Sequence, residues 1–320
     1  MSKRHTDKAY AVILVGGKGK RLAPISTAAR PKAFLPITKR DETMFKKTLD
    51  RVKKFIPKDH IVVVANKRHA NLVKIDFPDI ARGNLILEPL SRNTAPAIAL
   101  AASAIKKRSA DAVMMVLSSD HYISGDNSFI SSLLTGVDFV RRHWRKGPFV
   151  VVGIKPRFPA TGFGYIKLKP ISVRADVKNI YEVDRFVEKP DLKTARDFLK
   201  AGRYMWNAGI FIFKASLILK AIDIFEPAIS YAVKHAGEIR MNTLYKKLPD
   251  ISIDYAVMEK ADAIYCVKGR YGWQDIGDPN SLREVLEGEL KGLEKSTPGK
   301  NAPKKPLSMA ILERLRAMRL

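Results

Sequence analysis

Glycines and cations crowd a loop that follows the first apolar run of the chain. Gly16 and Gly17 come directly after "AVILV", Gly19 stands two residues further on, and Arg21 and Lys32 lie in the residues that follow. Glycines let backbone N–H groups approach an anion closely, and the two cations add full positive charge. We therefore expect this loop to hold phosphate groups.

Two common phosphate loops do not fit this stretch. A Walker loop is excluded because no Gly-Lys pair here is followed by Ser or Thr. The dinucleotide fingerprint also fails, since Leu22 stands at its third glycine position and the second predicted strand ends in Asn66 rather than an acid. GTPases, P-loop kinases and nicotinamide dehydrogenases are therefore not indicated.

An acidic residue, Asp120, follows the apolar run "AVMMVLSS". Ligands of open α/β sheets bind at the carboxyl ends of the strands, so a carboxylate at this place could bind a substrate or a cation. A solvated carboxylate at the end of a strand is the alternative. The run alone does not separate the two interpretations.

The loop and the acid lie at the ends of short apolar runs that alternate with helical patterns. Runs predicted as strands are "AVILV" (11–15), "HIVVVAN" (60–66), "NLILEP" (84–89), "AVMMVLSSD" (112–120) and "FVVVGI" (149–154). Runs that are apolar throughout indicate strands covered on both faces. This order is typical of a Rossmann-like, doubly wound α/β sheet, and later segments such as "NAGIFIFK" add strands to a mixed sheet.

Composition excludes several classes of protein. The chain has 320 residues, 46% of them hydrophobic, with one cysteine and six histidines. A zinc site, a disulfide scaffold and a membrane span are not indicated, and we expect a cytoplasmic protein. The net charge of +26 allows a nucleic-acid partner, but the aromatic residues are not interleaved with the cations as a stacking platform requires.

The cationic loop resembles the signature of the sugar nucleotidyltransferases. It reads "GGKGKRLAPIS" followed by "RPKAFL". Further blocks in the same order are similar to mannose-1-phosphate guanylyltransferases over roughly residues 10–284: "LEPLSRNTAPAIALAA", "VLSSDHYI", "TGFGYIKL", "FVEKP", "MWNAGIFIFK", "SIDYAVMEK" and "GWQDIGD". Eight ordered blocks make accidental similarity improbable.

The resemblance implies transfer of GMP from GTP to mannose 1-phosphate, with Mg²⁺ as cofactor. The sugar phosphate supplies the nucleophile, so the protein has to align two polyanions and neutralise charge. Asp120 matches the first magnesium ligand and Asp275 the second, with Asp278 a weaker candidate. Arg21 and Lys32 would contact the phosphates.

The remaining site residues are also implied by the resemblance. The nucleotide would contact Gly16, Gly17, Gly19, Glu88, Asn93 and Ser119. The sugar phosphate would contact Gly164, Glu188, Lys189 and Asn207. A carboxylate suits guanine because the base presents two donors, whereas Asn93 or Thr94 could equally cap the helix that follows.

The resemblance also implies how the chain is organised. Residues 1–290 would form the catalytic domain, with a nucleotide-binding half at 10–155 and a sugar-phosphate-binding half with a lid at 156–290. Residues 291–320 would be a basic linker and a C-terminal amphipathic helix. A homo-oligomer, most simply a dimer, is expected.

Departures from the family pattern leave alternatives open. Ala23, Ala33, Ser118-Ser119 and Ala208-Gly209 replace residues that are common in the family, although none of these changes removes a charged group. The chain could use another sugar 1-phosphate or nucleoside triphosphate. It could also be a non-catalytic regulatory homologue that binds a sugar nucleotide, and isomerase activity is not expected because the H-x-H segment of the bifunctional forms is missing.

Overall fold

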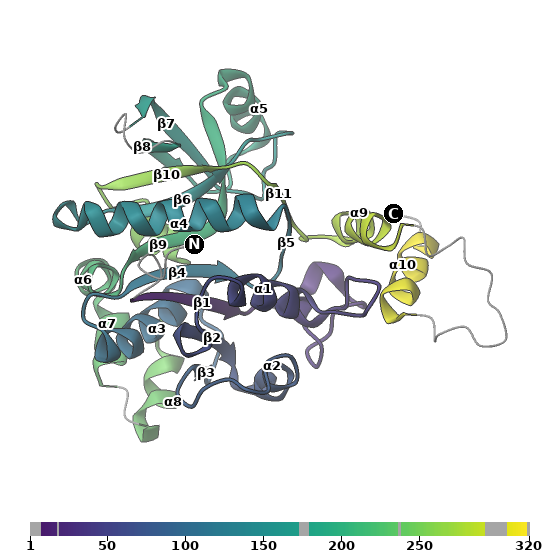
Figure 1. The fold of residues 1–320 in the computed structure, drawn as a ribbon, viewed down its shortest axis with the longest axis horizontal. Coiled ribbons are helices and arrows are strands. Elements are labelled where there is room, and N and C mark those ends of the chain that lie inside the picture. Colours follow the sequence, from purple (N-terminus) through teal and green to yellow (C-terminus); the bar gives the residue numbers. More distant parts are fainter. Residues whose placement is uncertain (1–7, 18, 173–178, 236–237, 292–305, 319–320) are drawn as a thin grey trace.

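The computed structural model describes residues 8–17, 19–172, 179–235, 238–291 and 306–318 (Figure 1). The strands are β1 (Ala9–Val15), β2 (Ile61–Asn66), β3 (Leu85–Glu88), β4 (Val113–Ser118), β5 (His121–Ser124), β6 (Phe149–Ile154), β7 (Tyr165–Ser172), β8 (Ile180–Val187), β9 (Tyr204–Lys214), β10 (Ile264–Gly269) and β11 (Gly272–Asp275).

The α-helices alternate with strands in the first part of the chain, and three of them follow β9 in succession. They are α1 (Met44–Lys53), α2 (Ala70–Asp76), α3 (Thr94–Arg108), α4 (Asp126–Arg142), α5 (Leu192–Ala201), α6 (Ala215–Phe225), α7 (Pro227–Lys234), α8 (Glu238–Lys246), α9 (Pro279–Leu290) and α10 (Leu307–Ala317). A π-helical segment, Asp254–Met258, precedes β10.

Nine of the described strands form one mixed sheet in the order β3-β2-β1-β4-β9-β6-β10-β8-β7. β1 pairs in parallel with both β2 and β4, while β9 runs antiparallel between β4 and β6. β5 and β11 pair separately as a small antiparallel sheet. The predicted strands of the first half are present, and "FVVVGI" coincides with β6.

Alternate residues of the central strands supply two hydrophobic cores, one on each face of the sheet. In β1, Ala11 and Ile13 face a core shared with α1 and α4, whereas Tyr10 and Val12 face a core shared with α3, α6 and α7. Successive side chains of a strand point to opposite faces, so a strand covered on both sides has to be apolar throughout.

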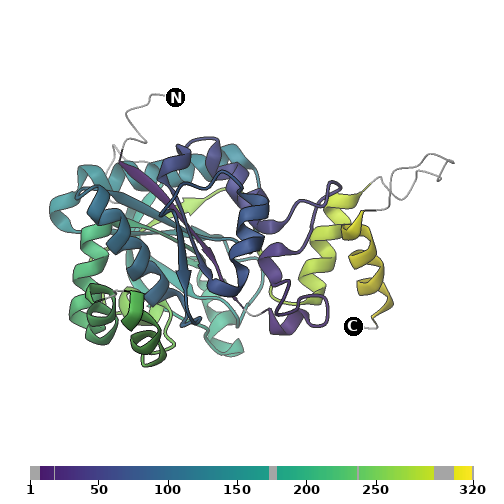
Figure 2. The same ribbon diagram turned by 90° about the horizontal axis from the view of Figure 1, so that it is seen from below.

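A third hydrophobic cluster lies at one end of the molecule, where α9 and α10 pack against the segment that follows β1 (Figures 1 and 2). α10 contributes Leu312 and Leu315, and the segment after β1 contributes Leu22. Asp41 accepts hydrogen bonds from the backbone N–H groups of Leu307 and Ser308, both 2.9 Å long. These contacts fix the start of α10 against the segment after β1.

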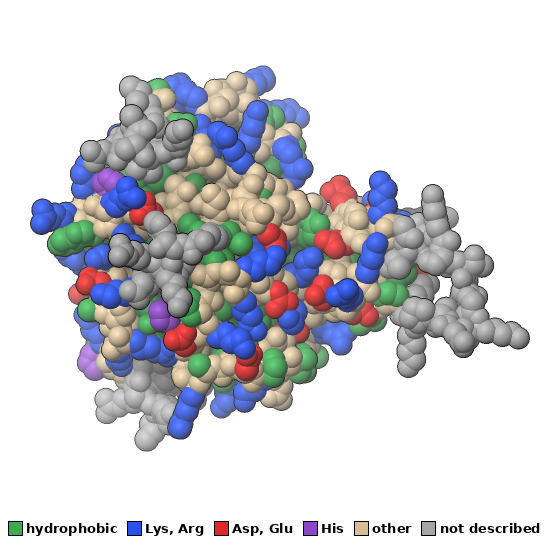
Figure 3. Space-filling model, in the orientation of Figure 1, with side chains coloured by type: hydrophobic (Ala, Val, Ile, Leu, Met, Phe, Trp, Pro, Cys, Tyr) green, Lys and Arg blue, Asp and Glu red, His purple; other side chains and the backbone are tan. Residues whose placement is uncertain are grey.

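The charged side chains are spread over the surface. On the face shown in Figure 3, Lys and Arg are scattered among acidic and other polar side chains and do not gather into one patch. In the part of the chain that the structure describes, no helix combines the length and the apolar character needed to cross a membrane.

Candidate active site

The phosphate loop turns sharply directly after β1. Gly17 has a φ of +96° and Gly19 a φ of +53°, values that favour glycine over residues with a side chain. A Cβ atom on Gly19 would lie 2.7 Å from Ser26 Oγ, which itself donates a 2.6 Å hydrogen bond to the Gly19 carbonyl. The loop is therefore tightly packed at Gly19, where a side chain would displace Ser26.

Lys32 brings the two predicted metal ligands together. Its Nζ lies 3.0 Å from Asp120 Oδ2 and 2.7 Å from Asp275 Oδ1. The lysine is only 6% exposed, so both ion pairs form in a partly dehydrated place where electrostatic attraction is strengthened.

The small β5–β11 sheet explains how Asp275 reaches Asp120. Asp275 is paired in register with His121, the residue directly after Asp120. Asp120 in turn follows the carboxyl end of β4 with one residue between them. Two acids that are distant in the sequence are therefore placed side by side by backbone pairing.

The electrostatics favour the charged forms of Asp120 and Lys32. Burial alone would raise the pKa of Asp120, but the charge of Lys32 and the Ser118 hydroxyl outweigh it and lower the pKa to about 2. Burial also opposes the charge on Lys32, yet Asp120 and Asp275 together raise the pKa of its ammonium group. Charge-assisted hydrogen bonds of this kind are stronger than neutral ones.

The same two carboxylates fit a magnesium ion. Because both lie within 3.0 Å of one nitrogen atom, both can reach a common cation. Among the described residues there is no group of three or more His, Cys, Asp or Glu side chains that could hold a metal. Mg²⁺ is commonly held by one or two carboxylates, with substrate phosphates and water completing its shell.

A cavity of about 230 Å³ collects the phosphate loop, the cations and the acids. It is lined by Gly17, Gly19, Arg21, Leu22, Lys32, Asp120, Asp275, Ile276 and Gly277. Two of the loop glycines, both predicted catalytic cations and both predicted metal ligands therefore border one small space. Gly16 borders a neighbouring cavity instead.

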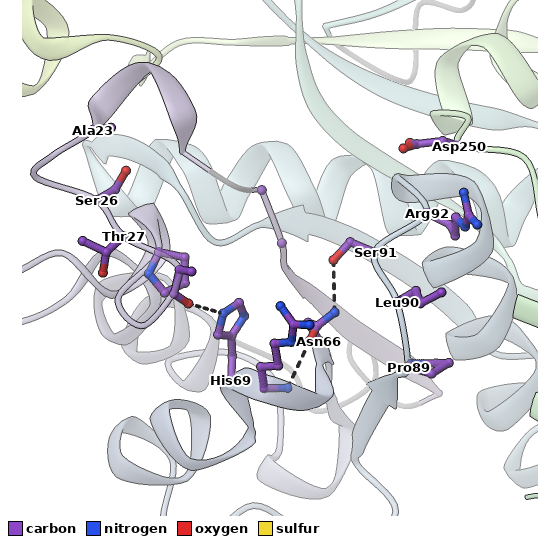
Figure 4. A pocket seen from close by; sticks show the side chains of 15 residues that line it. Ala23, Ser26, Thr27, Asn66, His69, Pro89, Leu90, Ser91, Arg92 and Asp250 are labelled. Atoms are coloured by element: carbon purple, nitrogen blue, oxygen red, sulfur yellow. Dashed lines mark hydrogen bonds between the residues drawn. The ribbon is translucent and has the colours of Figure 1, made fainter. Parts of the chain in front are cut away.

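That neighbouring cavity, of about 750 Å³, lies between the phosphate loop and the segment after β3 (Figure 4). Ser26 and Thr27 stand on one side, and Pro89 to Arg92 on the other. His69 hydrogen-bonds to the Ala28 carbonyl at 3.2 Å, which ties the floor of the cavity to the loop. Its size suits a nucleoside.

The two residues predicted to recognise the base line an adjoining cleft of about 540 Å³. Glu88 is 7% exposed and accepts a hydrogen bond from the Tyr245 hydroxyl. Asn93 caps α3, as its predicted second role required, and its Oδ1 accepts from the backbone N–H of Thr94 at 3.0 Å. Both side chains thus already have protein partners.

The predicted sugar-phosphate residues form a group of their own. Glu188 pairs with Lys189, and a Cβ atom on Gly164 would collide with the Glu188 carboxylate. The Asn207 backbone N–H donates to the Gly164 carbonyl at 2.8 Å. β7, β8 and β9 therefore bring all four residues together, and the cleft lined by Gly17 and Asp120 extends to Gly209 and Asp254 beside them.

One predicted nucleotide contact lies apart from the others. Ser119 is fully buried and borders none of the cavities described above, whereas Ser118 lines the cleft and donates to Asp120. The spacing in the sequence does not separate Ser118 from Ser119, because β4 ends at Ser118 and residues 119–120 form a turn. Asp254, which accepts a hydrogen bond from Asn207, was also missed, although it lies in the block "SIDYAVMEK".

The fold and the site together define a class of protein. Residues 10–292 match the nucleotidyl transferase family, and the chain belongs to that family. Among curated proteins it is 36% identical over 299 residues to a mannose-1-phosphate guanylyltransferase of Escherichia coli K12, covering 89% of this chain and 61% of that protein. The chain is thus a member of the nucleotidyl transferase family and is similar to mannose-1-phosphate guanylyltransferases, which confirms the resemblance seen in the sequence.

Solved structures agree with this assignment. A structure described as mannose-1-phosphate geranyltransferase from Thermus thermophilus is 33% identical, with a TM-score of 0.77, and the match covers 87% of this chain and 79% of that one. A UDP-glucose pyrophosphorylase complexed with UDP-glucose, at 15% identity and a TM-score of 0.59, shares the fold; that match covers 88% of this chain and 98% of the other. The chain spans about 60% of the length of the curated relatives it matches.

Proposed function

We propose that the chain transfers GMP from GTP to mannose 1-phosphate, giving GDP-mannose and pyrophosphate. The observation that carries this proposal is the convergence of Arg21, Lys32, Asp120 and Asp275 with the glycine loop around one cavity. The curated relatives that match most of this chain are named for the same activity, which supports the choice of substrates.

In this reaction an oxygen of the sugar phosphate attacks the α-phosphorus of GTP. The bond between the α-phosphorus and the bridging oxygen breaks, and pyrophosphate leaves with that electron pair. Arg21 and Lys32 bind and neutralise the phosphates, and Gly17 and Gly19 bind them through backbone N–H groups. Asp120 and Asp275 would hold Mg²⁺, which supplies positive charge to the α-phosphate when bound.

The base and the sugar would lie on opposite sides of this phosphate cavity. Guanine would lie where the two cavities share Ser91, so that the Glu88 carboxylate of the adjoining cleft accepts from its N–H groups after it releases Tyr245. The sugar would lie against Glu188, Lys189 and Asn207, with the β7–β8 hairpin and α5 as the lid. Residues 10–155 and 156–290 would then form the two binding halves.

Pyrophosphate release tests the proposal. Each nucleoside triphosphate is combined with mannose, glucose and other sugar 1-phosphates, with and without Mg²⁺. We expect the fastest release from GTP with mannose 1-phosphate and none when the metal is chelated. A preference for another base or sugar would correct the substrates, and failure of every pair to release pyrophosphate would favour a non-catalytic homologue.

A further inference from the structure

The carboxylate of Asp254 has no role in the reaction as described so far. It begins the π-helical segment Asp254–Met258 and lines the cleft that also borders Gly17 and Asp120. Its Oδ1 accepts a 2.8 Å hydrogen bond from Asn207 Nδ2. A partly buried acid thus touches a residue assigned to the sugar.

Two partners fix the orientation of the Asn207 amide. The backbone N–H of Gly209 donates to Asn207 Oδ1 at 3.1 Å, and a backbone N–H can only donate. Asp254 accepts from the other end of the amide, so the oxygen and the nitrogen cannot exchange places without losing both bonds. One N–H and one oxygen lone pair of the amide are left for a ligand.

The segment that carries Asp254 is anchored on the nucleotide side of the cleft. The backbone N–H of Ile253 donates to Thr94 Oγ1 at 2.8 Å, and the N–H of Ala95 donates to the Ile251 carbonyl at 3.2 Å. Both contacts are at the start of α3, directly after Asn93. Asp254 therefore links the segment beside the base to the residues beside the sugar.

The surroundings of Asp254 explain why such an acid is costly to keep. Burial raises its pKa to about 6, and the nearby charge of Glu188 adds to that effect. A neutral residue at this position would avoid the cost of burying a charge and the repulsion from Glu188. A carboxylate there is therefore not explained by the stability of the fold. A role toward the ligand accounts for it better.

We propose that Asp254 is a positioning residue of the sugar site, which holds the Asn207 amide so that its remaining N–H and lone pair meet hydroxyl groups of a hexose 1-phosphate. The inference rests on the proposed function, because it requires a sugar 1-phosphate as substrate. Asp254 acts through Asn207 and not on the reacting phosphorus.

The test compares Asp254→Ala, Asn207→Ala and the double variant. A lost hydrogen bond to a charged group predicts that Asp254→Ala raises the KM for mannose 1-phosphate about tenfold or more, while the KM for GTP changes less than about twofold. If Asp254 acts through Asn207, the double variant is no worse than Asn207→Ala alone. Asp254→Asn, which can still accept from Asn207, stays within about threefold of the wild type.

Controls separate positioning from general damage to the fold. Asp262→Ala removes an exposed acid nearby and should leave both KM values unchanged. If Asp254→Ala does not fold, Asp254→Ser replaces it, because a serine hydroxyl is too short to reach Asn207. Equal increases in both KM values, or additive effects in the double variant, would overturn the inference.

A wild-type chain without turnover would refute the proposed function but would still allow the inference to be tested. In that case the affinity for mannose 1-phosphate is measured by calorimetry in the wild type, in Asp254→Ala, in Asn207→Ala and in the double variant. The non-additive pattern in Kd would support the positioning role, whereas additive losses or no binding to the wild type would reject it.

Discussion

At the scale of single residues, Lys32 and a bound cation would draw on the same two carboxylates. Lys32 Nζ lies within 3.0 Å of both Asp120 and Asp275, so loss of either charge weakens the site whether lysine or metal is present. Asp120→Asn and Asp275→Asn should each lower turnover by about a hundredfold or more, since one electrostatic contact to a transition state is worth that much.

The matched control for this prediction is Asp278→Asn. Asp278 caps α9 through its side chain, and asparagine caps helices as well as aspartate does. The same change of charge three residues away should therefore leave turnover near the wild-type value. Rates are measured as pyrophosphate release at saturating substrates, with melting temperatures alongside. Near-normal rates for Asp120→Asn or Asp275→Asn would remove that residue from the site.

Glu88 makes the stability of the ligand-free protein depend on pH. Burial raises its pKa from the ordinary value of 4.5 to about 7, so the folded state holds a proton that the unfolded chain has lost. The free energy of unfolding is therefore highest at low pH. It falls by roughly 3 kcal/mol as the pH rises from about 4.5 to about 7. Glu88→Gln removes the ionisation.

The measurement for Glu88 is denaturant unfolding at pH 5 and pH 8, without nucleotide. Relative to the wild type, Glu88→Gln should gain stability on going from pH 5 to pH 8. A parallel pH dependence in both proteins would show that Glu88 ionises normally. Tyr245→Phe serves as a second variant, because it removes the hydroxyl that donates to Glu88.

At the scale of elements, α10 packs against the two loops that carry Arg21 and Asp275. Leu312 and Leu315 are buried in the cluster that also contains Leu22 and Ile276, the neighbours of Arg21 and Asp275. Leu312→Ala should destabilise this cluster by about 2–5 kcal/mol and so loosen both loops. We expect turnover to fall and proteolysis of the folded protein to accelerate.

Leu307→Ala is the control for α10, because Leu307 is on the same helix but 43% exposed. It should change neither turnover nor protease resistance. If Leu312→Ala accelerates proteolysis while turnover stays normal, α10 does not support the active site.

The strands could largely be predicted from the sequence, but the order in which they pair in the sheet could not. Continuous apolar runs predicted β1, β4 and β6 because strands buried on both faces cannot alternate in polarity. No local pattern places β9 antiparallel between β4 and β6, since strand order is decided by packing across the whole chain.

The same limit applies to the site. The glycine loop and Asp120 could be predicted because each lies within two residues of the end of a strand, and the ends of parallel strands meet at one edge of the sheet. The ion pair between Lys32 and Asp275 could not be predicted from the sequence, because it depends on the pairing of β5 with β11. The choice between Ser118 and Ser119 could not be made from the sequence either, because the turn at residues 119–120 decides which hydroxyl reaches Asp120.

At the scale of the whole molecule, the net charge of +26 would act on the proposed substrates, which are both anions. Since the cations on the face shown in Figure 3 are scattered, we expect a broad attractive field over that face and not one concentrated patch. Such a field is screened as the Debye length shrinks from about 30 Å at 0.01 M salt to about 8 Å at 0.15 M.

Salt should therefore raise both KM values while leaving kcat nearly unchanged, because screening weakens the encounter more than it weakens contacts inside the partly buried site. Rates are measured at constant free Mg²⁺ over that range of salt, with sucrose as a neutral control for viscosity. A KM that does not respond to salt would assign the excess charge to a different purpose. A fall in kcat equal to the rise in KM would show that salt acts on the bound phosphates themselves.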